Sequence, residues 1–147
     1  MDLRRLRPAL LATAVFAGCG EPQDGPPIHP VSGRVLVDGA PAVGAEVVFH
    51  STQTLGTVTP PPTAIVEPDG AFRPSTRTAG DGAPAGEYRL TVVWRGGPGL
   101  LADDAGGGED RLRGRYARAE TSGLQATIRP GENVIPPIDL KAAKSRR

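Results

Sequence analysis

The stretch GEYRLTVVW, residues 86–94, alternates between apolar and polar side chains and decides the fold class. Tyr88, Leu90, Val92 and Trp94 fall on one side of the alternation, and the other side holds mostly charged and polar residues. A period of two is typical of a β-strand with one buried face. We therefore expect a central strand here, in a domain built from strands.

The same period recurs on both sides of that stretch. VSGRVLV (31–37) and AEVVFHS (45–51) predict two strands joined by a turn, and GLQATIR (123–129) and VIPPIDL (134–140) predict later strands. The two prolines of the last stretch cannot donate ladder hydrogen bonds, so that strand belongs at a sheet edge. About seven short strands without helical periodicity predict an all-β sandwich or barrel. The expected inward side chains of these four strands are Val31, Val35, Val37, Ala45, Val47, Phe49, Leu124, Ala126, Ile128, Val134, Ile138 and Leu140.

Length and charge limit the function classes. At 147 residues the chain has room for one domain. The formal net charge is +1, but the basic residues gather at both ends of the chain, and residues 19–140 hold 10 basic and 15 acidic groups, a net charge of −5. An acidic body argues against a nucleic-acid partner, which would select a basic face. The tail KAAKSRR (141–147) is basic and is expected to be a solvated terminus.

The first residues have the pattern of an export signal. Arg4, Arg5 and Arg7 precede the apolar run PALLATAVFAG (8–18), which is too short for a membrane-spanning helix of about 20 residues. The sequence Phe16-Ala17-Gly18-Cys19 resembles the lipobox of bacterial lipoproteins, with Phe16 where Leu, Val or Ile is usual.

That resemblance implies a signal peptide over residues 1–18 and a mature chain that begins at a diacylated Cys19. Two acyl chains are enough to hold a protein stably at a membrane. Residues 19–30, polar and rich in proline, are then expected to form a flexible tether. The protein would be held in the cell envelope outside the cytoplasm, facing the periplasm or the cell surface. The alternative is an ordinary signal peptide followed by an incidental cysteine.

The order of the strand and turn segments resembles the transthyretin-like (prealbumin-like), or carboxypeptidase regulatory-like, domain. The segments that carry the likeness are VSGRVLVDGAPAVGAEVVF (31–49), PDGAF (68–72), DGAPAGEYRLTVVW (81–94) and GENVIPPIDL (131–140). Together with the lipobox and DRLRGRYARAETS (110–122), they are similar to small planctomycete-type lipoproteins. The resemblance implies a Greek-key β-sandwich over residues 31–140 and implies no activity.

The sequence offers few residues for catalysis or metal binding. It has two histidines, of which His29 falls in the expected tether and His50 is expected to point outward into solvent from a strand. A zinc site needs three or four histidine, cysteine or carboxylate ligands. No Gly-x-Ser-x-Gly elbow is present, and the chain lacks the Tyr-Arg-Gly-Ser ending of hydroxyisourate hydrolases, the enzymes of the transthyretin-like superfamily. We therefore expect no catalytic residues, no metal and no cofactor.

The connection between residues 96 and 122 is longer than an ordinary loop. Its first half is acidic but lacks the alternating spacing of a calcium loop. Its second half gathers arginine around an aromatic ring and is a candidate surface for a carbohydrate or an envelope protein. Alternatively, Leu112 and Tyr116 pack a turn or short helix onto the sandwich edge and leave the arginines in water. The candidate binding residues are Arg111, Arg113, Arg115 and Tyr116, with Arg118 beside them.

These observations predict a lipid-anchored, non-enzymatic β-sandwich that serves as a structural or binding module of the cell envelope. Its expected partners are the membrane, through Cys19, and a carbohydrate or another envelope protein. The alternative is a secreted enzyme or enzyme accessory subunit that uses the 96–122 loop. Clustering of Asp103, Asp104 or Asp110 with His50 in a cleft would favour that alternative, and scattered exposed carboxylates would contradict it.

Overall fold

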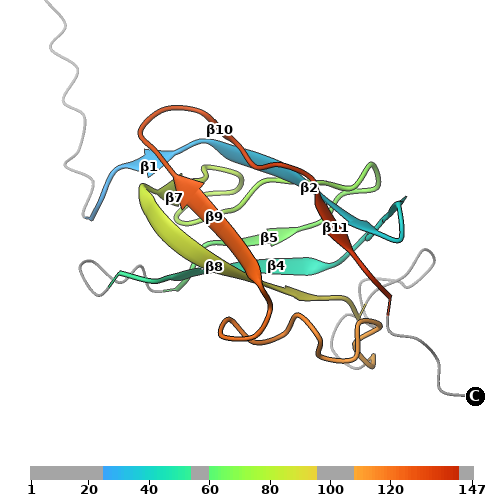
Figure 1. Cartoon of the computed structure of the whole chain (residues 1–147). Coiled ribbons are helices and arrows are strands. Elements are labelled where there is room, and N and C mark those ends of the chain that lie inside the picture. Colours follow the sequence, from blue (N-terminus) through green and yellow to red (C-terminus); the bar gives the residue numbers. More distant parts are fainter. Residues whose placement is uncertain (1–24, 54–59, 96–107, 143–147) are drawn as a thin grey trace, which may run out of the picture.

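A computed structural model of the chain describes residues 25–53, 60–95 and 108–142, and these residues form an all-β sandwich (Figure 1). Residues 1–24, which include Cys19 and half of the expected tether, lie outside the described residues, as do Asp103 and Asp104. None of the described residues forms a helix long and apolar enough to cross a membrane. The strands are β1 (Ile28–His29), β2 (Val31–Val37), β3 (Ala40–Pro41), β4 (Glu46–Ser51), β5 (Thr63–Ile65), β6 (Ala71–Phe72), β7 (Ala83–Pro84), β8 (Gly86–Val93), β9 (Leu124–Ile128), β10 (Asn133–Val134) and β11 (Ile138–Leu140).

The first layer of the sandwich is built around β2. β10 and β11 pair with β2 in parallel, and β3 and β6 pair with it antiparallel. The pairing joins the two ends of the domain, since the backbone N–H of Asp38 donates to the carbonyl oxygen of Leu140 at 2.9 Å. β11 pairs with no described strand other than β2, so the last strand lies at a sheet edge, as its two prolines predict.

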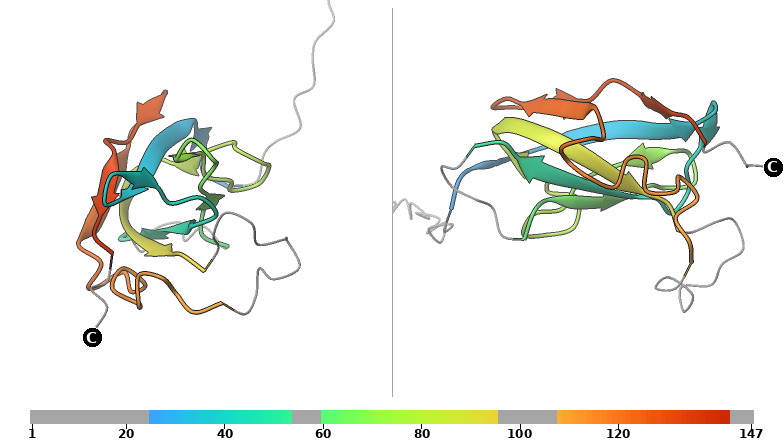
Figure 2. Two further views of the ribbon diagram at one scale, coloured as in Figure 1. Left: turned by 90° about the vertical axis from the view of Figure 1, so that its right-hand side faces the viewer. Right: turned by 60° about the horizontal axis from the view of Figure 1, so that its bottom comes forward.

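The second layer is antiparallel and has the strand order β5-β4-β8-β9. β8 is the strand predicted from GEYRLTVVW, and it lies between β4 and β9 as a central strand should. Its register places Leu90 opposite Phe49 and Arg89 opposite His50. Figure 2 shows the two layers facing each other. The even spacing of apolar residues in β8 and β4 therefore gives this layer one face for the core and one outer face.

The core between the layers contains the side chains that the alternation predicted in the long strands. Val35, Phe49 and Leu90 are fully buried, and the ring of Phe49 packs edge-on against that of Tyr88 with centroids 5.8 Å apart. Gly33 of β2 leaves room for the ring of Phe72, because a Cβ at position 33 would lie 2.5 Å from that ring. Leu124 and Ala126 of β9 are only half-buried, although Ile128 is buried as expected.

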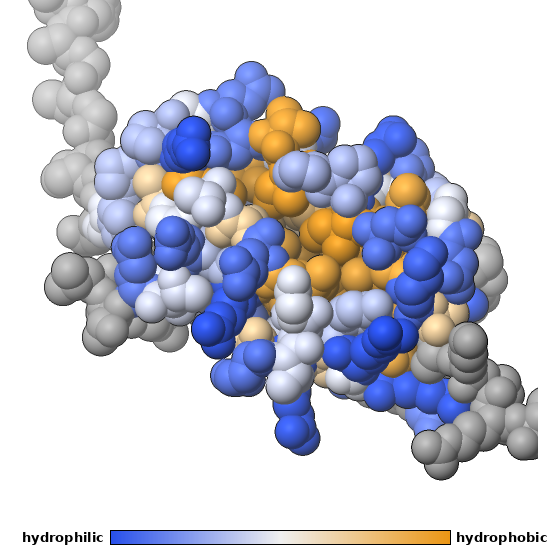
Figure 3. Space-filling model, viewed as in Figure 1, coloured by the Kyte–Doolittle hydropathy of each residue, from blue (hydrophilic) through white to orange (hydrophobic). Residues whose placement is uncertain are grey.

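The prediction for Val134 was wrong. Val134 is 75% exposed, whereas Ile135 is 8% exposed and points into the core. The two prolines at 136 and 137 separate β10 from β11, so the alternation that runs through Ile138 and Leu140 does not continue back across them. Figure 3 shows apolar surface along the side of the sandwich where β9 faces β10 and β11.

Two residues of the range expected to be a tether form a strand. Ile28 and His29 pair with Ala83 and Pro84 as β1 and β7, so the last residues of the range 19–30 belong to the folded domain. Gly82 makes this approach possible, because its φ is +104° and a Cβ there would collide with the backbone oxygen of His29. His29 is also not simply solvated, because its Nδ1 accepts a hydrogen bond from the backbone N–H of Gly131 at 3.2 Å.

Candidate functional site

The arginine-bearing loop continues the second layer where β9 stops. β9 pairs with β8 from Gly86 to Leu90. Beyond Leu90, the N–H of Val92 donates to the carbonyl of Tyr116 at 2.9 Å, and the N–H of Arg111 donates to the carbonyl of Trp94 at 2.8 Å. The loop is thus hydrogen-bonded to β8 as an irregular strand would be.

The carboxylate of Asp110 fixes the start of this loop. Its Oδ1 accepts hydrogen bonds from the backbone N–H groups of Trp94 and Leu112, both at 3.0 Å, and its Oδ2 accepts from the N–H of Gly114 at 2.7 Å. Arg113 has a φ of +53°, in the left-handed region, and the glycine that follows it has a φ of +72°. A charged acceptor that satisfies three N–H groups holds this tight turn in one conformation.

Two apolar side chains anchor the same loop to the sandwich. Leu112 is 1% exposed and belongs to the hydrophobic core, and Tyr116 packs half-buried against that core. The Tyr116 hydroxyl accepts a hydrogen bond from the backbone N–H of Lys141 at 3.2 Å. Leu112 and Tyr116 therefore pack onto the sandwich edge as their spacing predicts, in a series of turns and not in a helix.

The arginines of the loop lie on its outer side. The guanidinium of Arg111 stacks 3.8 Å from the centroid of the Trp94 ring, and that of Arg115 lies 5.6 Å from the centroid of the Tyr116 ring. Arg113, Arg115 and Arg118 are exposed. In the described ranges, no carboxylate lies within ion-pair distance of these three side chains. We call Arg113, Arg115, Arg118 and Tyr116 the arginine surface.

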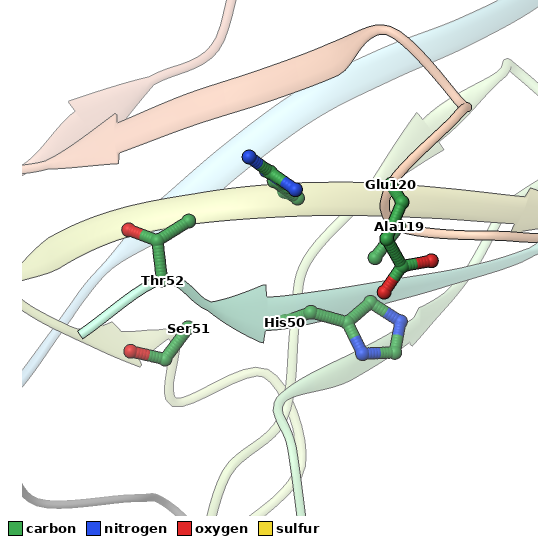
Figure 4. A pocket seen from close by; sticks show the side chains of 6 residues that line it. His50, Ser51, Thr52, Ala119 and Glu120 are labelled. Atoms are coloured by element: carbon green, nitrogen blue, oxygen red, sulfur yellow. The ribbon is translucent and has the colours of Figure 1, made fainter. Parts of the chain in front are cut away.

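A hollow of about 310 Å³ lies on the outer face of the second layer, at the other end of the same loop (Figure 4). His50 and Arg89 line it from the paired strands β4 and β8, and Glu120 reaches it from the loop. Ser51, Thr52 and Ala119 complete the lining. His50 is not simply solvated as expected, because its Nε2 lies 3.0 Å from the hydroxyl oxygen of Thr91, at hydrogen-bonding distance. Sequence reasoning missed this hollow, since no local pattern joins His50 to Arg89.

The clustering of Asp110 with His50 that would favour the enzyme alternative is not found in the described residues. Asp110 uses both carboxylate oxygens on the backbone of its own loop and does not line the hollow that contains His50. Within residues 25–53, 60–95 and 108–142, no three histidine or carboxylate groups gather into a metal site. Asp103 and Asp104 fall outside these ranges.

No family model and no curated protein matches the chain. Among solved structures, a DUF3823 family protein from Parabacteroides merdae is similar, with 17% sequence identity and a TM-score of 0.42. The match covers 80% of this chain and 46% of that one, so this chain spans slightly less than half the length of that protein.

Proposed function

We propose that this protein is a lipid-anchored component of the cell envelope and that its β-sandwich is a non-enzymatic binding module. The arginines before the apolar run, the length of that run and the cysteine directly after it support the anchor. Eight residues separate Cys19 from β1. A fully extended chain of that length reaches at most about 30 Å, so the sandwich would stay close to the lipid surface.

The arginine surface is the proposed binding surface of the module, and the observation that carries the proposal is its combination of exposed cations and a fixed backbone. Arg113, Arg115 and Arg118 have no carboxylate partner among the described residues, while Asp110 and Leu112 hold the loop beneath them. A surface ordered before binding loses less conformational entropy when a ligand arrives. The guanidinium fork matches carboxylate, phosphate and sulfate groups. The proposed ligand is an acidic carbohydrate polymer, with an acidic envelope protein as the second possibility.

Metabolic labelling tests the anchor. Cells that express the full chain are grown with labelled palmitate, and the protein is compared with a Cys19→Ser variant. The wild-type chain is expected to carry label and to remain in the membrane fraction, and the variant is expected to lose both properties. An unlabelled wild-type protein would contradict the anchor.

Binding to polygalacturonate, with neutral dextran as the control polymer, tests the surface. The double variant Arg113→Ala/Arg115→Ala is expected to bind at least about tenfold more weakly, because each charge-assisted hydrogen bond contributes about 1.5–3 kcal/mol. Arg129→Ala removes another exposed charge elsewhere and is expected to bind normally. Equal binding by the double variant and the wild type would remove the arginine surface from the proposal. If the polymer does not bind at all, the acidic-protein possibility is the one that remains.

A further inference from the structure

We infer that the hollow lined by His50, Arg89 and Glu120 binds a single sugar unit that carries a carboxylate, such as a uronic acid. The inference rests on the proposed function, because it gives the acidic-carbohydrate module a site for one unit of its ligand. It concerns a different group of residues from the arginine surface, so the two proposals can fail separately.

The topology brings the polar groups of the hollow together. His50 and Arg89 are directly opposite each other in the β4–β8 pair, and Cβ atoms in such positions lie about 5 Å apart. Both side chains project from the outer face of the layer, because Phe49 and Leu90 beside them point into the core. Figure 4 shows Ser51 and Thr52 on one side of the hollow and His50, with Glu120 above it, on the other.

The groups in the hollow differ in whether the protein already satisfies them. The Ser51 hydroxyl donates to the carbonyl of Gln53, and the Thr52 hydroxyl donates to the carbonyl of Glu87. In the described part of the chain, the guanidinium of Arg89 and the carboxylate of Glu120 make no hydrogen bonds and no ion pairs. They also do not pair with each other. Among the described residues, no group therefore competes with a ligand for these two side chains.

His50 adds an oriented ring to this pair. Its Nε2 is hydrogen-bonded to the hydroxyl of Thr91, a residue that is 5% exposed, so a buried partner holds the ring. The second ring nitrogen has no hydrogen-bond partner in the described residues. That nitrogen donates to or accepts from a hydroxyl, depending on the tautomer that Thr91 selects. The fixed ring of His50 and the neighbouring guanidinium of Arg89 therefore form a polar site that needs little ordering when a ligand binds.

This set of groups fits a carboxylated sugar better than it fits a neutral sugar or a simple carboxylic acid. The Arg89 fork pairs with a carboxylate in bidentate geometry, and Glu120 and His50 pair with ring hydroxyls. A neutral sugar leaves the guanidinium unpaired, and a simple carboxylic acid leaves Glu120 and His50 unused. A volume of about 310 Å³ lies at the small end of ligand pockets and suits one ring. The lining has no phenylalanine, tyrosine or tryptophan on which a sugar ring could stack, so polar groups would do the recognition.

The loop connects the hollow to the arginine surface. The carbonyl of Arg118 accepts hydrogen bonds from the N–H groups of Thr121 and Ser122, at 3.2 and 2.8 Å. This turn carries Ala119 and Glu120, which line the hollow. A polymer with one unit in the hollow would therefore place neighbouring acidic units toward the arginine surface.

Titration of the full chain with sodium glucuronate, glucose and sodium acetate, followed by NMR, tests the inference. Glucuronate is expected to bind in the millimolar range and to shift the resonances of His50 and Arg89, while glucose and acetate bind at least about tenfold more weakly. Arg89→Ala and Glu120→Gln are each expected to raise the Kd for glucuronate about tenfold, because each removes a charged partner of the ligand. Both side chains are exposed, so both variants are expected to fold normally. Arg129→Ala is the matched control and is expected to leave the Kd unchanged.

The outcomes separate this inference from the proposed function. Acetate that binds as tightly as glucuronate, or an Arg129→Ala variant that loses as much affinity as Arg89→Ala, would overturn the inference. The variant Arg113→Ala/Arg115→Ala is expected to lose polygalacturonate but to keep glucuronate. If polygalacturonate binds through Arg113 and Arg115 and glucuronate does not bind, the hollow is excluded and the arginine surface stands.

Discussion

Replacement of Asp110 by alanine is expected to destabilise the whole domain, although Asp110 lies in a loop. Its carboxylate is the shared acceptor of three backbone N–H groups, those of Trp94, Leu112 and Gly114. Trp94 directly follows the last residue of β8, and Leu112 is part of the core. Without the carboxylate, two N–H groups in a partly buried environment lose their acceptor, and the third turns to water.

The size of the effect follows from those three bonds. A hydrogen bond to a charged acceptor contributes about 1.5 kcal/mol or more in a partly buried setting, and a solvent-exposed bond contributes less. Asp110→Ala is therefore expected to lower the free energy of unfolding by about 3 kcal/mol. Asp110→Asn keeps one oxygen for Trp94 and Leu112 but sets an amide group against the N–H of Gly114, so we expect a loss of about 1–2 kcal/mol.

Urea unfolding measures this series. The chain contains one tryptophan, Trp94, and its fluorescence reports the region that the carboxylate holds, while circular dichroism reports the sheet. Glu109→Ala is the matched control, because Glu109 is the exposed acidic neighbour, and its effect is expected to stay within about 0.5 kcal/mol. If Asp110→Ala costs no more than Glu109→Ala, the carboxylate does not hold the loop, and the preorganisation argument for the arginine surface fails with it.

Three further substitutions test other parts of the structure. Leu112→Ala is expected to lower the free energy of unfolding by about 2–4 kcal/mol in the same urea assay, because its buried side chain joins the loop to the core. Gly82→Ala is expected to lower the free energy of unfolding by about 2–4 kcal/mol, because residue 82 has a positive φ and the added Cβ would collide with the backbone of His29. A variant as stable as the wild type would refute the close approach of β1 to β7. Burial tends to raise the pKa of Asp81, but hydrogen bonds from the backbone of residues 76–78 outweigh it and hold that pKa below its usual value. The Asp81 carboxylate therefore stabilises the folded state fully above the unfolded pKa of about 3.9, and this stabilisation is lost as the pH falls through the lower folded pKa. Asp81→Asn is expected to be less stable than the wild type at pH 7. Its free energy of unfolding is expected to fall less than that of the wild type between pH 4 and pH 2. Urea midpoints measured from pH 2 to 7 check this, and parallel curves for the two proteins would contradict it.

The long strands could be predicted from the sequence because each repeats its alternation several times. β2, β4 and β8 span six to eight residues, and their inward side chains are those that the pattern indicated. Five other strands have two residues each, which is too short for any period to appear. Only pairing with distant parts of the chain defines these strands. Such pairing also places His29, which was expected in the tether, in the β1–β7 pair.

The site was predictable only where its residues are close in sequence. The spacing of Leu112 and Tyr116 indicated packing, and the neighbouring arginines were visible as a cluster. The role of Asp110 was missed, because an acidic residue in a glycine-rich loop is also typical of a ligand for calcium or a catalytic acid; the signal was its position before a tight turn, where aspartate often accepts backbone hydrogen bonds. The pairing of His50 with Arg89 depends on the β4–β8 register, which the alternation does not determine.

The parallel pairing of β2 with β10 and β11 has a consequence for how the chain folds during synthesis. Among the described strands, β2 is the first long one to leave the ribosome, and the strands that complete its ladder are the last, about 100 residues later. Contacts between such distant residues raise the contact order and slow folding. The antiparallel strands β4 and β8 can meet much earlier, but Val35–Val37 of β2 lack their ladder partners on one edge until Leu140 has been added. A nascent chain that stalls before β11 would therefore present an unpaired strand edge, which favours aggregation. The domain is protected from such aggregation only after the final strand has left the ribosome and paired with β2.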